Sequence, residues 1–375
     1  MKRVRDLRLV SCPPPQYFPV MVKLAGATCK VLVEEFGTKF LLERFSDPFW
    51  FQAFACFLGY EHDSSGSTTV ITAALREALK RETHEVVLVG GKGKTSKKVP
   101  QELQKIGQEL KLDSKDVENM ISASRLCAKV DTVELQDGFS LYHHMIVLDK
   151  EMDWAVIQQG MNVETLTARR YHIPSRELNK IVETPHSGII SDLKWDTVLD
   201  LTAKESKNNR KMILEILKET SGEGIIKDIK RIAGKQDEKQ IKLTKWIKGE
   251  NQKIVKENFV PKFVLPPKRV RLENVKKLKS VEAENFAELL LVEGAGPSII
   301  RGLAYVAELV YGADFSRKDP SEFNFAFGSK SGRPYPVKPN DMIKTAEILE
   351  RAVEKAKIDE KNKMRGLERL RRFIK

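Results

Sequence analysis

Cysteine is scarce in this sequence, and the few cysteines lie far apart. There are four in 375 residues, and no two of them form a CxxC pair. Zinc sites built on paired cysteines and disulfide frameworks need closer or denser cysteines, so we expect neither. Cys29 and Cys56 lie among apolar neighbours, and we interpret them as small core residues.

Long apolar runs are also missing. No stretch approaches the roughly 20 uncharged apolar residues that a membrane-spanning helix needs. The start of the chain is interrupted by Asp6 and by three prolines before a signal-type apolar run develops. We therefore expect a cytoplasmic protein that does not enter a membrane.

The short motifs that identify common catalytic centres are absent as well. The sequence contains no HExxH, no paired DxD and no GxSxG elbow. No single motif therefore assigns a reaction. Function has to be argued from charge, from one phosphate-binding motif and from a cluster of polar residues.

Positive charge is what the sequence has in excess, with a formal net charge of +13. The segment from Lys204 to Ser280 holds about 22 Lys and Arg against about 10 Asp and Glu, and it nearly accounts for the whole surplus. Localised basic charge attracts a polyphosphate backbone through counterion release. A lysine-rich, solvated face of a heat-adapted protein is the alternative interpretation.

The patterning predicts an α+β fold that is mainly helical. Apolar runs at 139–148 and 154–159, joined by five polar residues, predict a central β-hairpin. Pro48 after Ser46 or Asp47 predicts the start of a buried helix. At this length we expect more than one core. The expected units are a mixed α/β, catalytic region at 1–203, a lysine-rich helical segment and linker at 204–280, and a C-terminal helical domain at 281–375.

A glycine pair between two apolar helical runs resembles a helix-hairpin-helix motif. Gly294-Ala295-Gly296 is followed by Pro297 at the first position of the second helix. Glycines let such a turn approach a phosphate closely, and the free N–H groups of the second helix converge on its oxygen. A plain αα-hairpin is the alternative interpretation of this glycine pair. Downstream, the aromatic stretch at 323–336, which includes Lys330 and Arg333, suits base stacking; its alternative interpretation is one buried face of a strand. The residues we assign to nucleic-acid binding are Gly294, Gly296, Pro297, Arg301, Lys330 and Arg333.

A glycine- and lysine-rich segment follows the strand predicted at 86–89. It comes within one residue of the nucleoside-triphosphate loop pattern, with Leu88 where the first glycine belongs. Pro100 marks a fresh helix start, whereas in a true phosphate loop the helix begins at the Lys-Thr pair. We therefore favour contact with a nucleic-acid phosphate over nucleotide hydrolysis. The residues assigned to it are Gly91, Lys92, Gly93 and Lys94.

Acids, imidazoles and amides are concentrated in the middle of the chain, where four of the six histidines lie. One hypothesis is metal-assisted phosphodiester cleavage, in which an aspartate and a histidine hold Mg²⁺ or Mn²⁺ and an arginine neutralises the phosphate. The alternative is a polar network that stabilises a partly buried sheet. Because side chains alternate along a strand, His143 and His144 point to opposite faces. The candidate catalytic residues are Asp131, Asp137, His143, His144, Gln159, Arg170, His172 and His186, with Asp137 and His144 as candidate metal ligands.

Several long motifs also carry a family resemblance. They are SDPFWFQAFACFLGYEHDSSG, VGGKGKTSKK, LQDGFSLYHHMIV, WAVIQQGMN, ARRYH, TPHSGI, GAGPSIIRGLA and GSKSGRPYPV. Over nearly its full length the chain resembles the archaeal and bacterial family described as domain of unknown function 763. That resemblance implies a prokaryotic origin and assigns no catalytic residue. We expect a DNA-binding protein, a metal-dependent nuclease or other repair enzyme; a non-catalytic DNA-binding protein is the alternative.

Overall fold

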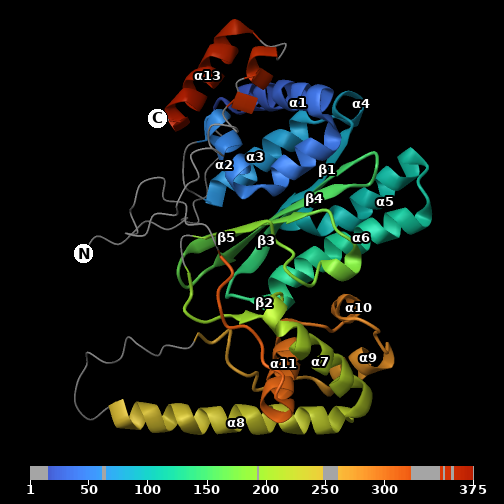
Figure 1. The fold of residues 1–375 in the computed structure, drawn as a ribbon, viewed down its shortest axis with the longest axis vertical. Helices are drawn as coiled ribbons and strands as arrows, with labels where there is room; N and C mark the ends of the chain where they lie inside the picture. The colour runs from blue at the N-terminus through green and yellow to red at the C-terminus, as the bar shows by residue number, and fades with distance from the viewer. Residues whose placement is uncertain are drawn as a thin grey trace.

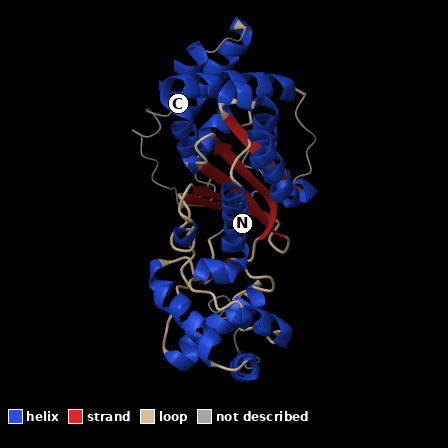
Figure 2. Cartoon of the chain, turned by 90° about the vertical axis from the view of Figure 1, so that its right-hand side faces the viewer, coloured by secondary structure: helices blue, strands red, loops and turns tan. Residues whose placement is uncertain are grey.

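The computed structural model describes residues 16–60, 65–191, 194–247, 261–321, 347–348, 351–355 and 359–374. Helices dominate this part of the chain, and they surround an antiparallel sheet (Figure 1). In a view turned by 90°, the molecule is elongated, with the strands in its middle and helices at both ends (Figure 2). The prediction of an α+β, mainly helical fold is confirmed.

The main sheet has five strands in the order β1-β3-β4-β5-β6. Its strands are β1 (Val86–Lys92), β3 (Ser140–Asp149), β4 (Trp154–Asn162), β5 (Thr167–Pro174) and β6 (Gly188–Ser191). The predicted hairpin is confirmed as β3 and β4, which place His144 opposite Gln158. A second small sheet pairs β2 (Leu135–Gln136) with β7 (Leu199–Asp200).

One face of the sheet packs against the N-terminal helices (Figure 1). These are α1 (Phe18–Ser46), α2 (Pro48–Phe57), α3 (Ser65–Ala78) and the short α4 (Arg81–His84). Gly37, predicted to end the first helix, breaks α1 with φ 83°, a region that glycine adopts easily. The Asp47 carboxylate accepts hydrogen bonds from Phe49 and Trp50, which confirms the predicted cap of α2.

The other face packs against α5 (Val99–Leu110) and α6 (Ser114–Lys129). Asp113 caps α6 and accepts a hydrogen bond from the Lys115 N–H. After Lys129 the chain winds into a π-helix, Val130–Glu134, before it enters β2. A π-helical turn is rare and is frequent at functional sites.

Within the lysine-rich segment, which was predicted to combine helix and linker, the described residues include three α-helices. α7 (Lys207–Glu219), α8 (Gly222–Ile247) and α9 (Leu272–Ser280) pack with α10 (Phe286–Leu291) and α11 (Pro297–Tyr311). Their apolar side chains join the cluster that lies beneath α5 and α6. We expected 281–375 to form one domain, but α13 (Glu360–Ile374) packs against α2 at the other end of the molecule (Figure 1).

Candidate active site

The sheet divides the eight predicted catalytic residues into two sets. Side chains alternate along β3, β4 and β5, so neighbouring residues face opposite layers. One set lies on or against the sheet face that packs against α5 and α6, and it consists of Asp131, Asp137, His144 and His186. The other set lies on the sheet face that packs against α1, α2 and α3, and it consists of His143, Gln159, Arg170 and His172. The two sets cannot form one site.

The set facing the N-terminal helices is enclosed. His143 lies 3.2 Å from the Thr72 hydroxyl, and the His172 ring nitrogen Nδ1 lies 2.9 Å from the Phe45 carbonyl oxygen. Burial lowers the pKa of His143 to about 3 and lowers the pKa of His172 well below its usual range. Arg170 lies over the Phe51 ring. Neutral imidazoles packed between a sheet and helices match the alternative of a stabilising polar network.

A chain of hydrogen bonds connects three of the four residues on the other face, His144, Asp131 and His186. His144 joins the Ser124 hydroxyl at 2.7 Å and the Gln158 side-chain oxygen at 2.8 Å. Gln158 donates to one Asp131 oxygen at 2.6 Å, and the other oxygen lies 2.6 Å from His186 Nε2. Burial raises the pKa of Asp131, and the neighbouring His186 opposes that shift. The chain thus leads from the core of the sheet to the His186 ring.

The π-helix supplies the acid of this chain and a second buried carboxyl group. Asp131 and Glu134 are both 0% exposed. Within the described residues, neither Glu134 side-chain oxygen has a hydrogen-bond partner. Burial raises the pKa of Glu134 well above its usual range. Sequence reasoning missed Glu134; the available signal was an acidic residue between two apolar ones, Val133 and Leu135.

His186 lines a polar cavity of about 430 Å³. Lys194, Lys204 and Lys318 lie on its exposed parts. Its other polar side chains include Thr184, Ser187, Asp200, Thr202, Glu205, Ser316 and Asp319. Two of these carboxylates are engaged, because Asp319 pairs with Arg169 and Asp200 accepts hydrogen bonds from Thr202. At the mouth the three lysines therefore outnumber the one exposed carboxylate, Glu205, and sequence reasoning assigned none of these lysines.

The loop that carries His186 is held in an unusual backbone conformation. Thr184 has φ 45°, in the left-handed region that residues with a branched side chain rarely adopt. Its N–H donates to the Thr202 carbonyl at 2.8 Å, and its carbonyl accepts from Arg176 at 2.7 Å. Such strained residues persist where surrounding contacts enforce them and cluster at functional sites.

Arg169, rather than the assigned Arg170, lies on this face of the sheet. Its guanidinium bonds to Asp137 at 2.8 Å and to both oxygens of Asp319. Tyr171 donates a further hydrogen bond to Asp137. Burial raises the pKa of Asp137 to about 6, against the opposing charge of Arg169. This buried ion cluster joins the wall of the cavity to the sheet.

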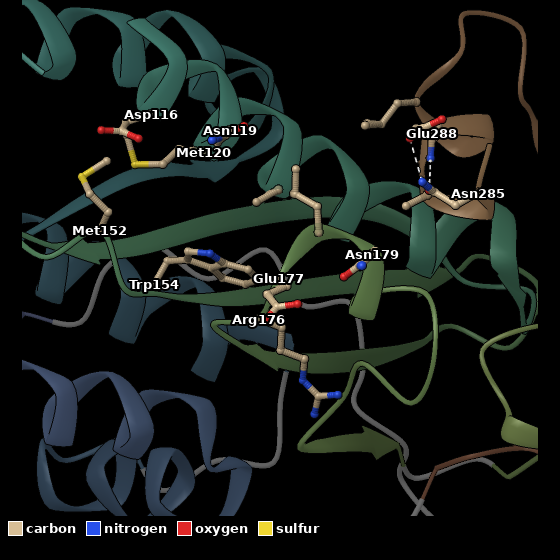
Figure 3. Close-up of a pocket in the computed structure, with 14 residues that line it drawn as sticks. Asp116, Asn119, Met120, Met152, Trp154, Arg176, Glu177, Asn179, Asn285 and Glu288 are labelled. Carbon is tan, nitrogen blue, oxygen red and sulfur yellow. Dashed lines mark hydrogen bonds between the residues drawn. The ribbon is translucent and has the colours of Figure 1, made fainter. Parts of the chain in front are cut away.

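A second cavity, of about 550 Å³, lies between α6, the strand β4 and α10 (Figure 3). Its lining is apolar around Trp154, Met120 and Met152. Its charged lining residues are Asp116, Arg176, Glu177 and Glu288. Three carboxylates against one cation repel a phosphate, so of the two cavities the one beside His186 suits an anionic ligand.

The two candidate metal ligands belong to separate parts of the network. Asp137 accepts from Arg169, Tyr171 and the Phe139 N–H, whereas both ring nitrogens of His144 have hydrogen-bond partners. Across the described residues, no group of three or more His, Cys, Asp or Glu is arranged to hold a metal ion. The use of Mg²⁺ or Mn²⁺ stays a prediction.

The glycine- and lysine-rich segment forms no continuous loop. Gly91 and Lys92 belong to β1, whereas Gly93 and Lys94 begin a 3₁₀ helix, Gly93–Lys98. The preceding Gly90 N–H donates to the Glu102 carboxylate at 2.9 Å. Phosphate contact by the exposed Lys92 and Lys94 stays a prediction.

The glycine pair forms the turn between α10 and α11, as the sequence predicted. Gly294 has φ 100°, Gly296 caps α11, and Pro297 is its first residue. Arg301 turns inward and donates to the Gln136 side chain and the Phe263 carbonyl. Phosphate binding by this turn stays a prediction, and the assigned Lys330 and Arg333 lie outside the described residues.

Comparison with known proteins identifies the family. The family model described as protein of unknown function (DUF763) matches residues 3–337. No curated protein and no solved structure matches the chain. No helix among the described residues has the length and apolar character needed to cross a membrane. The chain belongs to the DUF763 family.

Proposed function

We propose that this member of the DUF763 family binds DNA and cleaves a phosphodiester bond at the cavity beside His186. One observation carries the proposal. A histidine oriented by a buried aspartate lies in a polar cavity whose exposed cations are three lysines. A cationic cavity attracts a phosphate, and an oriented imidazole can move a proton to or from its oxygens.

The expected chemistry follows from the partners of His186. Asp131 holds Nε2, which leaves Nδ1 for a water molecule in the cavity. As water attacks phosphorus, its proton passes to Nδ1, a new P–O bond forms, and the bond to the leaving oxygen breaks. The protonated imidazole then returns the proton to the leaving oxygen. Lys204 and Lys318 stabilise the charge that develops on the phosphate.

The hairpin turn provides a second contact for the same DNA. At the start of α11 the first N–H groups have no partner within the helix, and Gly294 and Gly296 keep side chains away from them. Contacts to backbone phosphates position a strand without reading its sequence. The turn would therefore add affinity, and the cavity would carry the reaction.

A non-catalytic DNA-binding protein is the second candidate. It is favoured by the hydrogen-bond chain from Ser124 to Asp131, which also serves to stabilise the sheet, and by the absence of a metal cluster among the described residues. In that case the lysine-lined cavity would hold a phosphate without cleaving it.

Cleavage and retention of labelled DNA separate the two candidates. We expect the wild type to cut DNA, with Mg²⁺, Mn²⁺ and EDTA reactions showing whether a metal takes part. His186→Ala should lower the cleavage rate by about 10² to 10⁴, the usual contribution of a general acid or base, while DNA retention in a gel persists. The matched control is His84→Ala, a histidine bonded to the Gly26 carbonyl away from the cavity. Retention by the wild type without cleavage under every condition would establish the second candidate.

A further inference from the structure

The reacting group of the proposed site is recessed. The His186 side chain is 7% exposed, and the cavity walls come from three segments, 184–189, 200–205 and 316–320, and from Lys194. Its volume of about 430 Å³ falls in the range of pockets that enclose one small ligand, about 300 to 1,000 Å³. A phosphate can reach His186 only on a strand that bends into this space.

A strand within a paired duplex bends poorly into a recessed cavity. Its strands are held together by pairing and stacking, and enzymes that act in a recessed pocket must extrude the target nucleotide or take a single strand. Extrusion costs a few kcal/mol, and that cost is smallest where the strand is already unpaired. The shape of the cavity therefore favours an unpaired strand.

The side chains that line the cavity suit the sugar-phosphate backbone of that strand better than its bases. Stacking of bases needs aromatic side chains, and among the described lining residues His186 has the only aromatic ring. The planar side chains that read base edges through paired hydrogen bonds are Arg, Asn and Gln, and the described lining includes none of these. Hydroxyl groups of Thr184, Ser187 and Ser316, together with the lysines, suit phosphate and sugar oxygens.

We infer that the substrate enters the cavity as an unpaired nucleic-acid strand recognised through its sugar-phosphate backbone, without base preference. The inference rests on the proposed function and names the form of its substrate. It assigns Lys204 and Lys318, which lie on two different wall segments of the cavity, to binding the phosphate of that strand.

Four labelled substrates test the inference on the full chain: oligo-dT, a single strand of mixed sequence, the same mixed strand in a gapped duplex, and a covalently closed circular duplex. Both single strands should be cut at similar rates, at least about tenfold faster than the closed circle, because extrusion adds more than about 1.4 kcal/mol to the barrier. The gapped duplex should be cut only within the gap.

The double variant Lys204→Ala/Lys318→Ala should weaken binding of both single strands by the same factor. Lys105→Ala/Lys115→Ala, which changes exposed lysines on α5 and α6, is the matched control and should bind as the wild type does. Nicking of the closed circle as fast as the single strands, or cleavage of only one base composition, would overturn the inference while the proposed function stands. Failure to cut any of the four substrates contradicts the proposed function, and the inference with it.

Discussion

Glu134 differs from the neighbouring buried acids Asp131 and Asp200 because its side chain has no hydrogen-bond partner among the described residues. Burial raises its pKa well above the usual range, so the folded protein favours the protonated carboxyl group. The contribution of Glu134 to the free energy of unfolding is complete below the pKa that its carboxyl group has in the unfolded chain. This contribution is lost as the pH rises through the higher pKa of the same group in the folded protein.

Glu134→Gln tests this assignment, because glutamine cannot ionise. Between pH 5 and pH 8 the wild type should lose unfolding free energy relative to the variant, by up to about 1.4 kcal/mol for each pH unit over which Glu134 is protonated only in the folded state. Urea unfolding at four pH values measures the difference. Glu118→Gln, an exposed change on α6, should follow the wild type at every pH. A constant difference between Glu134→Gln and the wild type would show that Glu134 does not titrate in this way.

Arg169 should be the most sensitive charged residue of the sheet. Its side chain is 0% exposed and pairs with two buried carboxylates, Asp137 and Asp319. Replacement by methionine leaves both acids without their cation, and we expect a loss of about 3 to 5 kcal/mol of unfolding free energy. Denaturant titration measures it. Arg231→Met, at an exposed i,i+3 pair with Asp228, is the control. Equal midpoints for the two variants would refute the account of the ion cluster.

Single residues also show where sequence reasoning stops. Strand alternation correctly separated His143 from His144, because that property depends only on neighbouring positions. The same reasoning could not choose Arg169 over Arg170, since the choice depends on which helices cover each face. Lys194 and Lys204 lie far from Lys318 in the sequence, and only the fold brings the three lysines to one cavity.

At the scale of elements, local signals located most boundaries. Gly37, Asp47 and Pro48 gave the break in α1 and the start of α2, because caps and glycine angles act within a few residues. The π-helix was not predicted, since a π-turn has no comparable local signature, although one of its acids, Asp131, was among the candidate catalytic residues. Helix α8 lies in the segment predicted to combine helix and linker, but its bounds were not predicted, because the high lysine content obscured the apolar face that includes Ile225 and Ile229.

The turn between α10 and α11 offers an internally controlled test. Gly294 has φ 100°, whereas Gly296 has φ −112°, an angle open to any residue. Gly294→Ala should lower the unfolding free energy by about 1 to 2 kcal/mol, because a Cβ is strained in that region. Gly296→Ala should change it by less than half as much. Thermal unfolding of the two variants provides the comparison, and an equal loss for both would contradict the strain argument.

At the scale of the whole molecule, the sheet stands between two helical ends (Figure 1). The apolar cluster that runs from β1 through α6 to α11 connects the mixed α/β region to the basic helices. The His186 cavity is built where these parts meet, since its walls include Asp200 of β7 and the segment that follows α11. Positive charge on α7, α8 and α9 would therefore draw DNA toward the part of the molecule that borders the cavity.

Chemical rescue of His186→Ala by imidazole is the most direct test of the central claim. The variant removes the proton-transferring ring and leaves space for a free imidazole in the cavity. The account predicts that the variant retains DNA but scarcely cleaves it, and that added imidazole restores cleavage in proportion to its concentration, whereas the Lys204→Ala/Lys318→Ala variant shows no such response. A variant that cleaves at the wild-type rate, or that binds DNA and stays inactive at every imidazole concentration, would contradict it.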